Sequence, residues 1–413
     1  MDVIHPRCAG VDISKKDAKV CIRIQGVSGK RATSTVTTWG SMTNQILGLR
    51  QHLLAADVTM VVMEATGDYW RPFYYLLEAD IPVMLVNAHE AKNVPGRKTD
   101  VSDAAWLADL GAHGLVRASF VPPKPIREIR SLTRARTVIT RERSRELQRL
   151  EKLLEDAGIK LSSVATDISG VSGRLMLKAL IDGCQDPSAM AEMAKGAMRS
   201  KIGVLTEALT GQFSPHHAFM TQLYLDRIDA DNAQITSLDS RIDGLIEPYR
   251  PIMALLESIP GISKRVAEIF IAETGADMRQ FPTAGHLASW AGTSPGSNES
   301  AGHIKSAKIR PGNRYLKGAL GMAAISAART KDTYYSAKYR RITNRRGPMK
   351  AIVALEHSML IAAWHMLTNG AFYREPGADY FSQRQPAQTK ARALAQLKAL
   401  GYQVTIEPNE ATA

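Results

Sequence analysis

The N-terminal part of the chain alternates between strand and helix patterns, and this alternation limits its fold more than any other feature. Strand patterns occur at 8–13, 19–26, 30–39, 59–65 and 81–86. Helical patterns occur between and after them, at 42–56, 69–79 and 101–112. The first two strands are joined by a short turn, so they predict an antiparallel pair. Strand–helix–strand units follow, so the region predicts an α/β sheet with both faces covered.

Acidic residues stand at the ends of these elements. Asp12 lies near the end of the first strand, Glu64 ends a buried strand, and Asp100 and Asp103 share one face at the start of a helix. The carboxyl ends of parallel strands form a common edge, so the four carboxylates could converge there. Such a group needs cations to neutralise it, and oxygen ligands suit Mg²⁺ or Mn²⁺. Two such ions can clamp a phosphodiester during displacement.

Each of these acidic residues could instead have an ordinary structural role. Asp100 can cap the helix, and Asp103 is favoured by the helix dipole. An actin-like ATPase shares an aspartate on its first strand, but it requires a glycine-rich phosphate turn where Ser14 to Lys16 stand here. The basic pair Arg97 and Lys98 just before Asp100 is a candidate for holding a nucleic-acid backbone beside the acids.

The positive charge of the chain is concentrated in two blocks. The net charge is +13, and residues 301–350 hold thirteen Lys and Arg residues and one acid, while residues 117–160 hold twelve Lys and Arg residues and six acids. Phosphate contacts supply most non-specific nucleic-acid affinity, so this distribution indicates a polyanionic partner. Three cysteines without metal spacing favour a reduced, cytosolic protein. The sequence predicts neither a signal peptide nor a membrane span.

The middle of the chain predicts a long helix. Prolines at 122, 123 and 125 indicate a boundary, and residues 126–156 contain neither Gly nor Pro. An imperfect apolar seam runs along this segment, formed by Leu132, Ile139, Leu147, Leu150 and Leu154. The pattern predicts an exposed helix that could form a coiled coil between protomers.

The region after 250 combines small polar residues with cations. A Pro-Gly-Ile turn at 260–262 resembles a helix–hairpin–helix, although any helical hairpin has the same pattern. Ser300 has small neighbours and could attack a phosphate held by basic groups, or it could be an ordinary loop serine. Candidate nucleic-acid contacts follow it, at Lys305, Lys308, Arg310, Asn313, Arg314, Arg340, Arg341, Arg345 and Arg346. Tyr334, Tyr335 and Tyr339 lie among the last of these, a mixture typical of sites for single strands or RNA. Residues 351–367 predict a buried helix.

Taken in order, these motifs resemble one family. The segments GVDISK, VVMEATGDYW, KTDVSDA, IPGI, SWAGTSPGSNESAG and GNRYLKGAL follow one another along the chain in this order. The set resembles the DEDD transposases of the insertion sequence one-ten family, whose members are guided by a bridge RNA. The resemblance implies an RNase H fold of the RuvC-like kind with a divalent-metal tetrad at Asp12, Glu64, Asp100 and Asp103. It also implies a catalytic serine, which corresponds to Ser300 here. His303 and Lys317 depart from the pattern, in which Lys and Arg are usual.

The resemblance further implies an RNA-guided recombinase that acts on donor and target DNA through a covalent serine–DNA linkage. The tetrad of one protomer would combine with the serine of another, as dimers assemble to a tetramer in the bacterial cytoplasm near the nucleoid. Four segments are expected: a RuvC-like domain at 1–115, a helical oligomerisation region at 116–250, a mostly helical transposase domain at 251–375, and a tail at 376–413. Ser294 and Ser297 are alternative nucleophiles. A RuvC-like junction nuclease that uses water, and a binding protein with a degenerate site, are the alternative functions.

Overall fold

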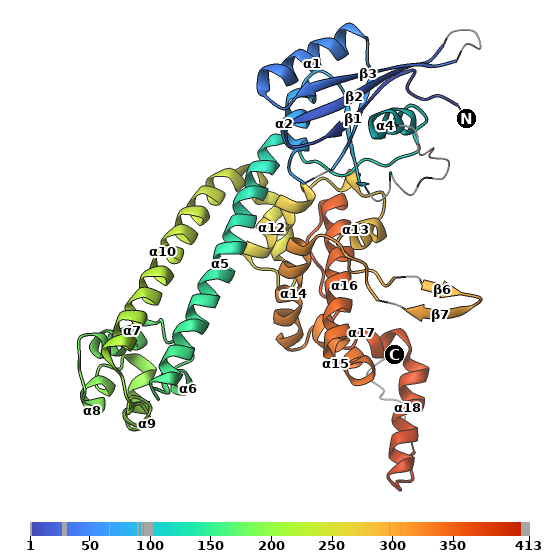
Figure 1. Cartoon of the computed structure of the whole chain (residues 1–413). Helices are drawn as coiled ribbons and strands as arrows, with labels where there is room; N and C mark the ends of the chain where they lie inside the picture. Colours follow the sequence, from blue (N-terminus) through green and yellow to red (C-terminus); the bar gives the residue numbers. More distant parts are fainter. Residues whose placement is uncertain are drawn as a thin grey trace. The chain divides into compact units, whose positions relative to one another are not determined.

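The computed structural model describes residues 2–26, 31–65, 67–88, 91, 94, 102–296, 298–306 and 308–405. The chain divides into two compact units, Met1–Val121 and Pro122–Ala413. This division falls at the prolines where the sequence indicates a boundary. The expected boundary at 250 lies inside the second unit, at the first residue of α11 (Arg250–Glu257). Figure 1 labels the elements along the chain.

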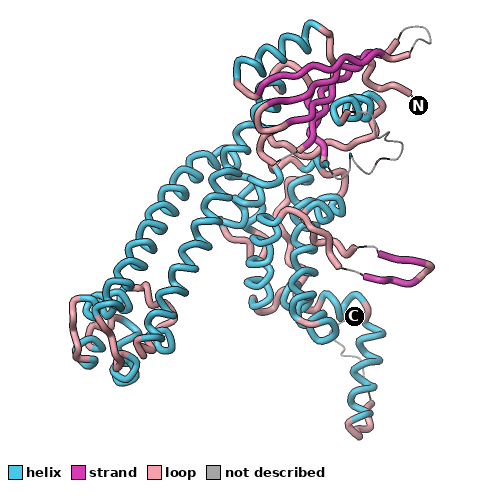
Figure 2. Tube along the Cα trace, in the orientation of Figure 1, coloured by secondary structure: helices cyan, strands magenta, loops and turns pink. Residues whose placement is uncertain are grey.

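The first unit is built on a five-stranded mixed sheet with the strand order β3-β2-β1-β4-β5 (Figure 2). Its strands are β1 (Arg7–Ile13), β2 (Asp17–Ile24), β3 (Thr33–Gly40), β4 (Met60–Glu64) and β5 (Val83–Val86). The first three strands are antiparallel neighbours, whereas β4 lies parallel to β1 and β5 lies parallel to β4. The predicted α/β sheet is therefore confirmed, including the third strand.

Helices cover both faces of this sheet. They are α1 (Thr43–Ala55), α2 (Trp70–Leu77) and α4 (Asp103–Ala112). Alternate strand residues such as Val11 and Val20 pack with α1 and α2, including Phe73 of α2, in one apolar cluster. The intervening residues of the strands, such as Cys8 and Val62, pack against α4. Because side chains alternate along a strand, β1 presents Ala9 and Val11 to one layer and Cys8 and Gly10 to the other.

The second unit begins with a long helical hairpin, whose two arms are α5 (Lys124–Asp156) and α10 (Pro215–Ile246). Between them in the sequence lie the helices of a small lobe: α6 (Leu161–Val164), α7 (Val171–Ile181), α8 (Pro187–Ala191), η1 (Gly196–Lys201) and α9 (Ile202–Ala208). This lobe packs on Leu150 and Leu154 of α5. The predicted single long helix is confirmed, and its partner here is α10 of the same chain. Coiled-coil contact between protomers stays a prediction.

The middle of this hairpin is polar rather than apolar. Arg136, which is 3% exposed, donates Nη1 to Asp239 Oδ1 of α10 at 2.7 Å and approaches Glu268 Oε2 at 2.6 Å. Further along, Arg143 donates to Asn232 Oδ1 at 2.9 Å. The residues that α5 buries between its ends are Thr133, Arg136 and Glu146. The leucine seam expected from the sequence is therefore right only at the C-terminal end of α5.

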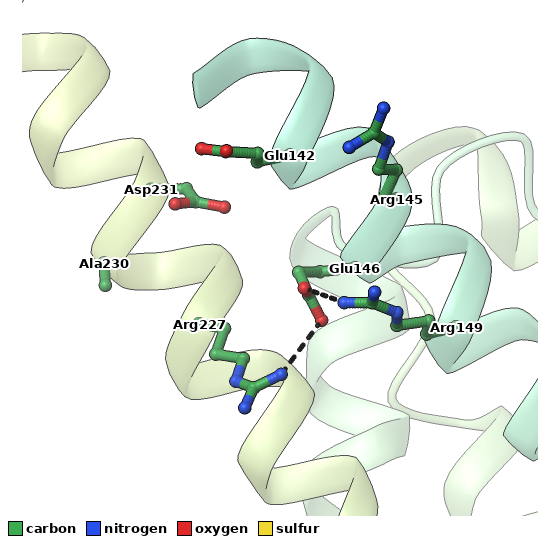
Figure 3. Close-up of a pocket in the computed structure, with 7 residues that line it drawn as sticks. All are labelled: Glu142, Arg145, Glu146, Arg149, Arg227, Ala230 and Asp231. Atoms are coloured by element: carbon green, nitrogen blue, oxygen red, sulfur yellow. Dashed lines mark hydrogen bonds and ion pairs between the residues drawn. The ribbon is translucent and has the colours of Figure 1, made fainter. Parts of the chain in front are cut away.

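A pocket of about 390 Å³ opens between α5 and α10. Figure 3 shows Glu142 of α5 and Asp231 of α10 pointing toward each other, with Glu146 between Arg149 and Arg227. Burial raises the pKa of Asp231, and the charges of Glu142 and Glu146 raise it further. Arg149 and Arg227 form ion pairs with Glu146 and offset this negative charge. We therefore interpret the residues that line the pocket as ion pairs that hold α5 and α10 together.

The core of the second unit lies between the helices that follow the hairpin. They are η2 (Glu247–Tyr249), α11 (Arg250–Glu257), α12 (Lys264–Thr274), η3 (Met278–Gln280), α13 (Ala284–Trp290), α14 (Arg314–Arg329), α15 (Tyr334–Arg346) and α16 (Pro348–Asn369). The Pro-Gly-Ile turn joins α11 to α12, and its Gly261 packs on α14: a Cβ there would lie 2.3 Å from Ala323 O. The ordinary helical-hairpin interpretation is thus sufficient for this turn. Two helices follow, α17 (Tyr380–Arg384) and α18 (Pro386–Ala399).

Helix α16 is the central helix of this core. In the described part of the chain it alone is long and apolar enough to cross a membrane by length and composition. Leu355, Met359 and Leu360 are completely buried against the surrounding helices, which explains its apolar composition without a membrane. The prediction of a buried helix at 351–367 is confirmed.

Glu356 of α16 should make the stability of this core depend on pH. The side chain is 4% exposed, and burial raises its pKa to about 7, against a smaller opposing effect of Lys317. The folded protein therefore keeps a proton that the unfolded chain loses near its ordinary pKa of about 4.3. Stability is full below that value and falls as pH rises toward 7, by at most about 4 kcal/mol. Glu356→Gln should flatten this dependence and raise the Tm at pH 8 in thermal denaturation, whereas an unchanged pH profile would contradict the assignment.

Candidate active site

Asp12 and Glu64 stand side by side at the ends of neighbouring parallel strands. The pairing of β1 with β4 matches Val11 to Met63, so the next residue on each strand is an acid. Both side chains are half-buried. Asp12 shares the face of Cys8 and Gly10, and Glu64 shares the face of Val62, because residues two apart point to the same side. Both carboxylates therefore belong to the face of the sheet that α4 covers.

Glycine at position 10 lets α4 approach this face closely. A Cβ at Gly10 would lie 2.0 Å from Ala104 O, near the start of α4. At the other end of the helix, a Cβ at Gly111 would lie 2.8 Å from Cys8 Sγ. Helix α4 thus runs from the Asp12 end of β1 toward the Cys8 end. This direction brings Asp103, the first residue of α4, to the edge that carries Asp12 and Glu64.

The start of α4 is capped by Ser102, whose Oγ accepts a hydrogen bond from Ala105 N at 3.3 Å. Asp103 lies in the first turn, where the helix dipole favours a carboxylate. Asp100, Arg97 and Lys98 lie outside the described residues, and their predicted roles stay predictions.

The acidic edge fits a divalent cation by the chemistry of its donors. Three carboxylates from two strands and one helix are oxygen ligands of the kind that Mg²⁺ and Mn²⁺ prefer. Among the described residues, however, no group of three or more His, Cys, Asp or Glu side chains is arranged to hold a metal ion. The fourth acid suggested by the sequence, Asp100, lies in the undescribed segment just before α4.

Lys19 is a neighbour of this edge that sequence reasoning missed. It is the cross-strand partner of Asp12 in the β1–β2 hairpin, and it is exposed. Directly paired residues project to the same face, so a cation stands beside the carboxylates. The sequence could have predicted this pairing of Lys19 with Asp12. The turn between the two strands is short, and the length of such a turn sets which residues pair across the hairpin.

Ser300 lies on an arm that projects from the second unit between α13 and α14 (Figure 1). The arm ends in the hairpin of β6 (Asn298–Ser300) and β7 (His303–Ser306). At its root the two chain segments touch through glycine: a Cβ at Gly312 would lie 2.3 Å from Gly292 N. Farther out, Gly296 N donates to Lys308 O at 3.2 Å. Close backbone contacts therefore hold a narrow two-stranded arm at several points.

The tip of the arm presents Ser300 to solvent. Ser300 and His303 are paired across a two-residue turn formed by Ala301 (φ 51°) and Gly302 (φ 78°). Positive φ at both central residues is the geometry of the type I′ turn that closes tight hairpins. Ser300 is exposed, whereas Ser294 is half-buried nearer the root of the arm, and Ser297 lies outside the described residues. Of the two described serines, Ser300 is the one better placed to meet a macromolecular substrate.

A cationic groove lies at the root of the arm. It has a volume of about 800 Å³, and its lining includes Lys308, Arg310 and Lys317. The α14 helix begins beside it, so its N-terminal backbone dipole adds to the positive potential. Arg314, in the first turn of α14, is exposed and packs over the Tyr315 ring at 5.2 Å. Together these groups form a surface suited to a phosphate backbone.

Asn313 is engaged inside the unit, which changes how its role is understood. Its Oδ1 accepts from Tyr315 N and Leu316 N, capping α14, and its Nδ2 donates to Glu273 Oε2 at 2.6 Å. Glu273 is completely buried and accepts both Nε and Nη2 of Arg134 at 2.7 Å. This network makes Asn313 a residue that fixes the root of the arm. These bonds use one of the two Nδ2 hydrogens, so the expected nucleic-acid contact of Asn313 stays a prediction.

The cations of α15 have mixed surroundings. Arg340 is exposed but donates to Ser336, and Arg341 stacks over the Phe381 ring at 4.8 Å. Arg345 and Arg346 are exposed in the last turn of α15. The tyrosines among them differ from the expected stacking surface: Tyr335 is 1% exposed and stacks on Tyr373 inside the core. This part of the sequence interpretation was wrong for Tyr335.

Two family models match the chain. Residues 9–159 match a DEDD transposase domain of the IS110 group, described as Transposase, and residues 253–340 match a domain described as Transposase IS116/IS110/IS902 family. The first match contains Asp12, Glu64 and α4, and the second contains the arm, the groove and most of α15.

Several curated proteins are similar over different parts of the chain. An uncharacterized 43.6 kDa protein of insertion element IS110 from Streptomyces coelicolor is 32% identical, over 35% of this chain and 36% of its own length. An uncharacterized 42 kDa protein of IS900 from Mycobacterium paratuberculosis is 29% identical, over 69% of this chain and 75% of its own. The transposase of insertion sequence element IS1111A from Coxiella burnetii is 21% identical, over 88% of this chain and 90% of its own length.

Proposed function

Starting from the premise that this chain is a DNA transposase with both transposase domains of the IS110 family, we propose that it is an RNA-guided recombinase. It excises and inserts a mobile element by cutting and rejoining donor and target DNA. The observation that carries the proposal is the pairing, in one chain, of an acidic sheet edge with an exposed serine on a cationic arm. An acidic edge alone is sufficient for hydrolysis of a phosphodiester by water. A serine presented beside phosphate-binding groups can instead attack the phosphate and form a covalent protein–DNA intermediate.

The acidic edge holds divalent metal in this proposal. Asp12, Glu64 and Asp103, with Asp100, would bind Mg²⁺ or Mn²⁺, which when bound supplies charge neutralisation and polarisation of the scissile phosphate. Lys19, paired with Asp12, attracts a phosphate oxygen to the same face. Arg97 and Lys98 are proposed to contact the DNA backbone next to the acids.

Ser300 is the nucleophile in this proposal, and it forms a phosphoserine linkage to the DNA. Lys305 is exposed on β7 close to it, and Lys308, Arg310 and Lys317 line the groove at the root of the arm. These cations hold the phosphate backbone and offset the charge that develops during attack. Arg314 and the exposed arginines of α15, Arg340, Arg341, Arg345 and Arg346, extend the nucleic-acid surface, for which a bridge RNA is a second ligand.

The working enzyme is proposed to be an oligomer in the bacterial cytoplasm, associated with the nucleoid. The acids of one protomer and the Ser300 of another form each composite site as dimers assemble to a tetramer. The α5–α10 hairpin offers a long polar surface for such contacts. Because base pairing by the RNA selects donor and target, the protein needs few sequence-specific contacts of its own.

Reconstitution tests this function. The purified chain is mixed with Mg²⁺, a labelled duplex carrying the joined element ends, and RNA transcribed from the non-coding flank of the element. We expect recombinant product and a covalent protein–DNA adduct that require both the RNA and the metal. Equal product without the RNA would contradict guidance.

A metal-dependent junction nuclease of the RuvC-like kind is the second candidate. It is favoured by the acidic edge, which is suited to activating water without help from Ser300. Its products would be free 5′-phosphate ends and no adduct, so product chemistry in the same reaction separates the two functions.

A further inference from the structure

The hairpin at the tip of the arm places a histidine beside Ser300. Ser300 and His303 are direct partners in the pairing of β6 with β7. Side chains of such a pair project to the same face, with Cβ atoms about 4.5–5.5 Å apart. Glu299 pairs with Ile304, next to this pair along the hairpin, and so belongs to the opposite face. The register then shifts, because Asn298 pairs with Ser306, and this leaves the exposed Lys305 as the extra residue of a β-bulge two residues along β7 from His303. A hydroxyl and an imidazole therefore stand together on one side of the arm, and the bulge next to them carries an exposed ammonium group.

This arrangement is fixed by the turn and open to solvent. The two-residue turn with positive φ at Ala301 and Gly302 sets the pairing, so a slip in register is disfavoured. Ser300, His303 and Lys305 are all exposed. Within the described residues, neither Ser300 nor His303 forms a side-chain hydrogen bond, so neither is engaged elsewhere in the fold. The imidazole is available to a proton on the neighbouring hydroxyl.

We propose that His303 is the general base that accepts the proton of Ser300, and that Lys305 holds the phosphate undergoing attack. This inference rests on the proposed function of Ser300 as nucleophile. As the Oγ–P bond forms and the bond from phosphorus to the departing 3′ oxygen breaks, the hydroxyl proton passes to neutral His303. The departing oxygen takes a proton from water.

Rejoining reverses the same transfers. A 3′-hydroxyl attacks the phosphoserine, the Oγ–P bond breaks, and protonated His303 returns its proton to Oγ. The attacking hydroxyl gives its proton to water. One imidazole thereby serves as base in cleavage and as acid in rejoining, as microscopic reversibility requires. Lys305, exposed two residues along β7, is the neighbouring charged group on this strand of the hairpin.

The test is the rate of adduct formation as a function of pH in the complete RNA–DNA reaction. In the unaltered protein the rate should fall as pH drops from about 8 to about 5.5, because a protonated imidazole cannot accept a proton. His303→Gln should lower the rate about 100-fold at the higher pH and remove this fall. Since His303 is exposed, DNA binding and the Tm of the variant should stay unchanged.

Two matched variants isolate the effect. Lys305→Gln should raise the DNA concentration needed for half-maximal rate while keeping the pH dependence, and Glu299→Gln, on the opposite face, should change neither. An unchanged rate in His303→Gln, or a lowered rate with the original pH dependence, would overturn the inference while the proposed function stands. If the unaltered protein forms no adduct, or if Ser300→Ala still forms it, the proposed function itself fails.

Discussion

Ser300→Ala abolishes the covalent protein–DNA adduct and all strand exchange, while RNA and DNA binding stay within about twofold. This is the expected result because the substitution removes the attacking oxygen and nothing else of consequence. Ser300 is exposed at the end of β6, so loss of its hydroxyl neither opens a cavity nor leaves a buried polar group without a partner. The Tm should therefore change by less than about 1 °C.

Denaturing gel electrophoresis of a labelled duplex measures the adduct directly. Ser294→Ala is the matched control, because Ser294 lies on the same arm but is half-buried near its root. Ser297→Ala tests the remaining alternative. If Ser300→Ala keeps the adduct and one of the other variants loses it, that other serine is the nucleophile. If all three variants keep the adduct, none of these three serines is the nucleophile.

The fold of the first unit could be predicted from sequence because its signals are local. Buried strands such as 59–65 are apolar up to a terminal acid, and the turn between the first two strands is short, so the elements and the mixed α/β sheet follow from pattern alone. The convergence of Asp12 with Glu64 also follows, since both end parallel strands. The close approach of α4 to the sheet was harder to predict from the sequence. It depends on Gly10 and Gly111, and the need for glycine at these positions is seen only once the helix lies on the sheet.

The second unit was predicted less well because tertiary contacts override its local patterns. The α5 helix reads as an amphipathic helix with a leucine seam, yet its middle is held by Arg136 between Asp239 and Glu268. Tyr335 reads as a stacking residue among arginines, yet it belongs to the core. The sequence also gives no sign that Asn313 donates a hydrogen bond to the buried Glu273. In each case the partner is distant in sequence, and no spacing rule reveals it.

Removal of a carboxylate from the acidic edge should eliminate catalysis and metal binding together. We expect Asp12→Asn and Glu64→Gln each to lower cleavage at least about 1,000-fold, because each amide is neutral and a poorer ligand for Mg²⁺. Without metal, the variants should keep a cooperative thermal transition, because each amide has nearly the same size and shape as the carboxylate that it replaces. Binding of metal to the folded state adds stability, about 1.4 kcal/mol at tenfold excess over the Kd.

Thermal denaturation with and without Mg²⁺ separates these effects from simple misfolding. The unaltered protein should gain Tm on addition of Mg²⁺, and Asp12→Asn should lose this gain while keeping a cooperative transition. Asp57→Asn is the matched control: Asp57 is an exposed acid of the same unit, paired only at 3.9 Å with Arg7, and asparagine tolerates its positive φ of 50°. If Asp57→Asn loses the Mg²⁺ response equally, or Asp12→Asn keeps it, the metal does not bind at this edge, and Asp12 and Glu64 act in another way.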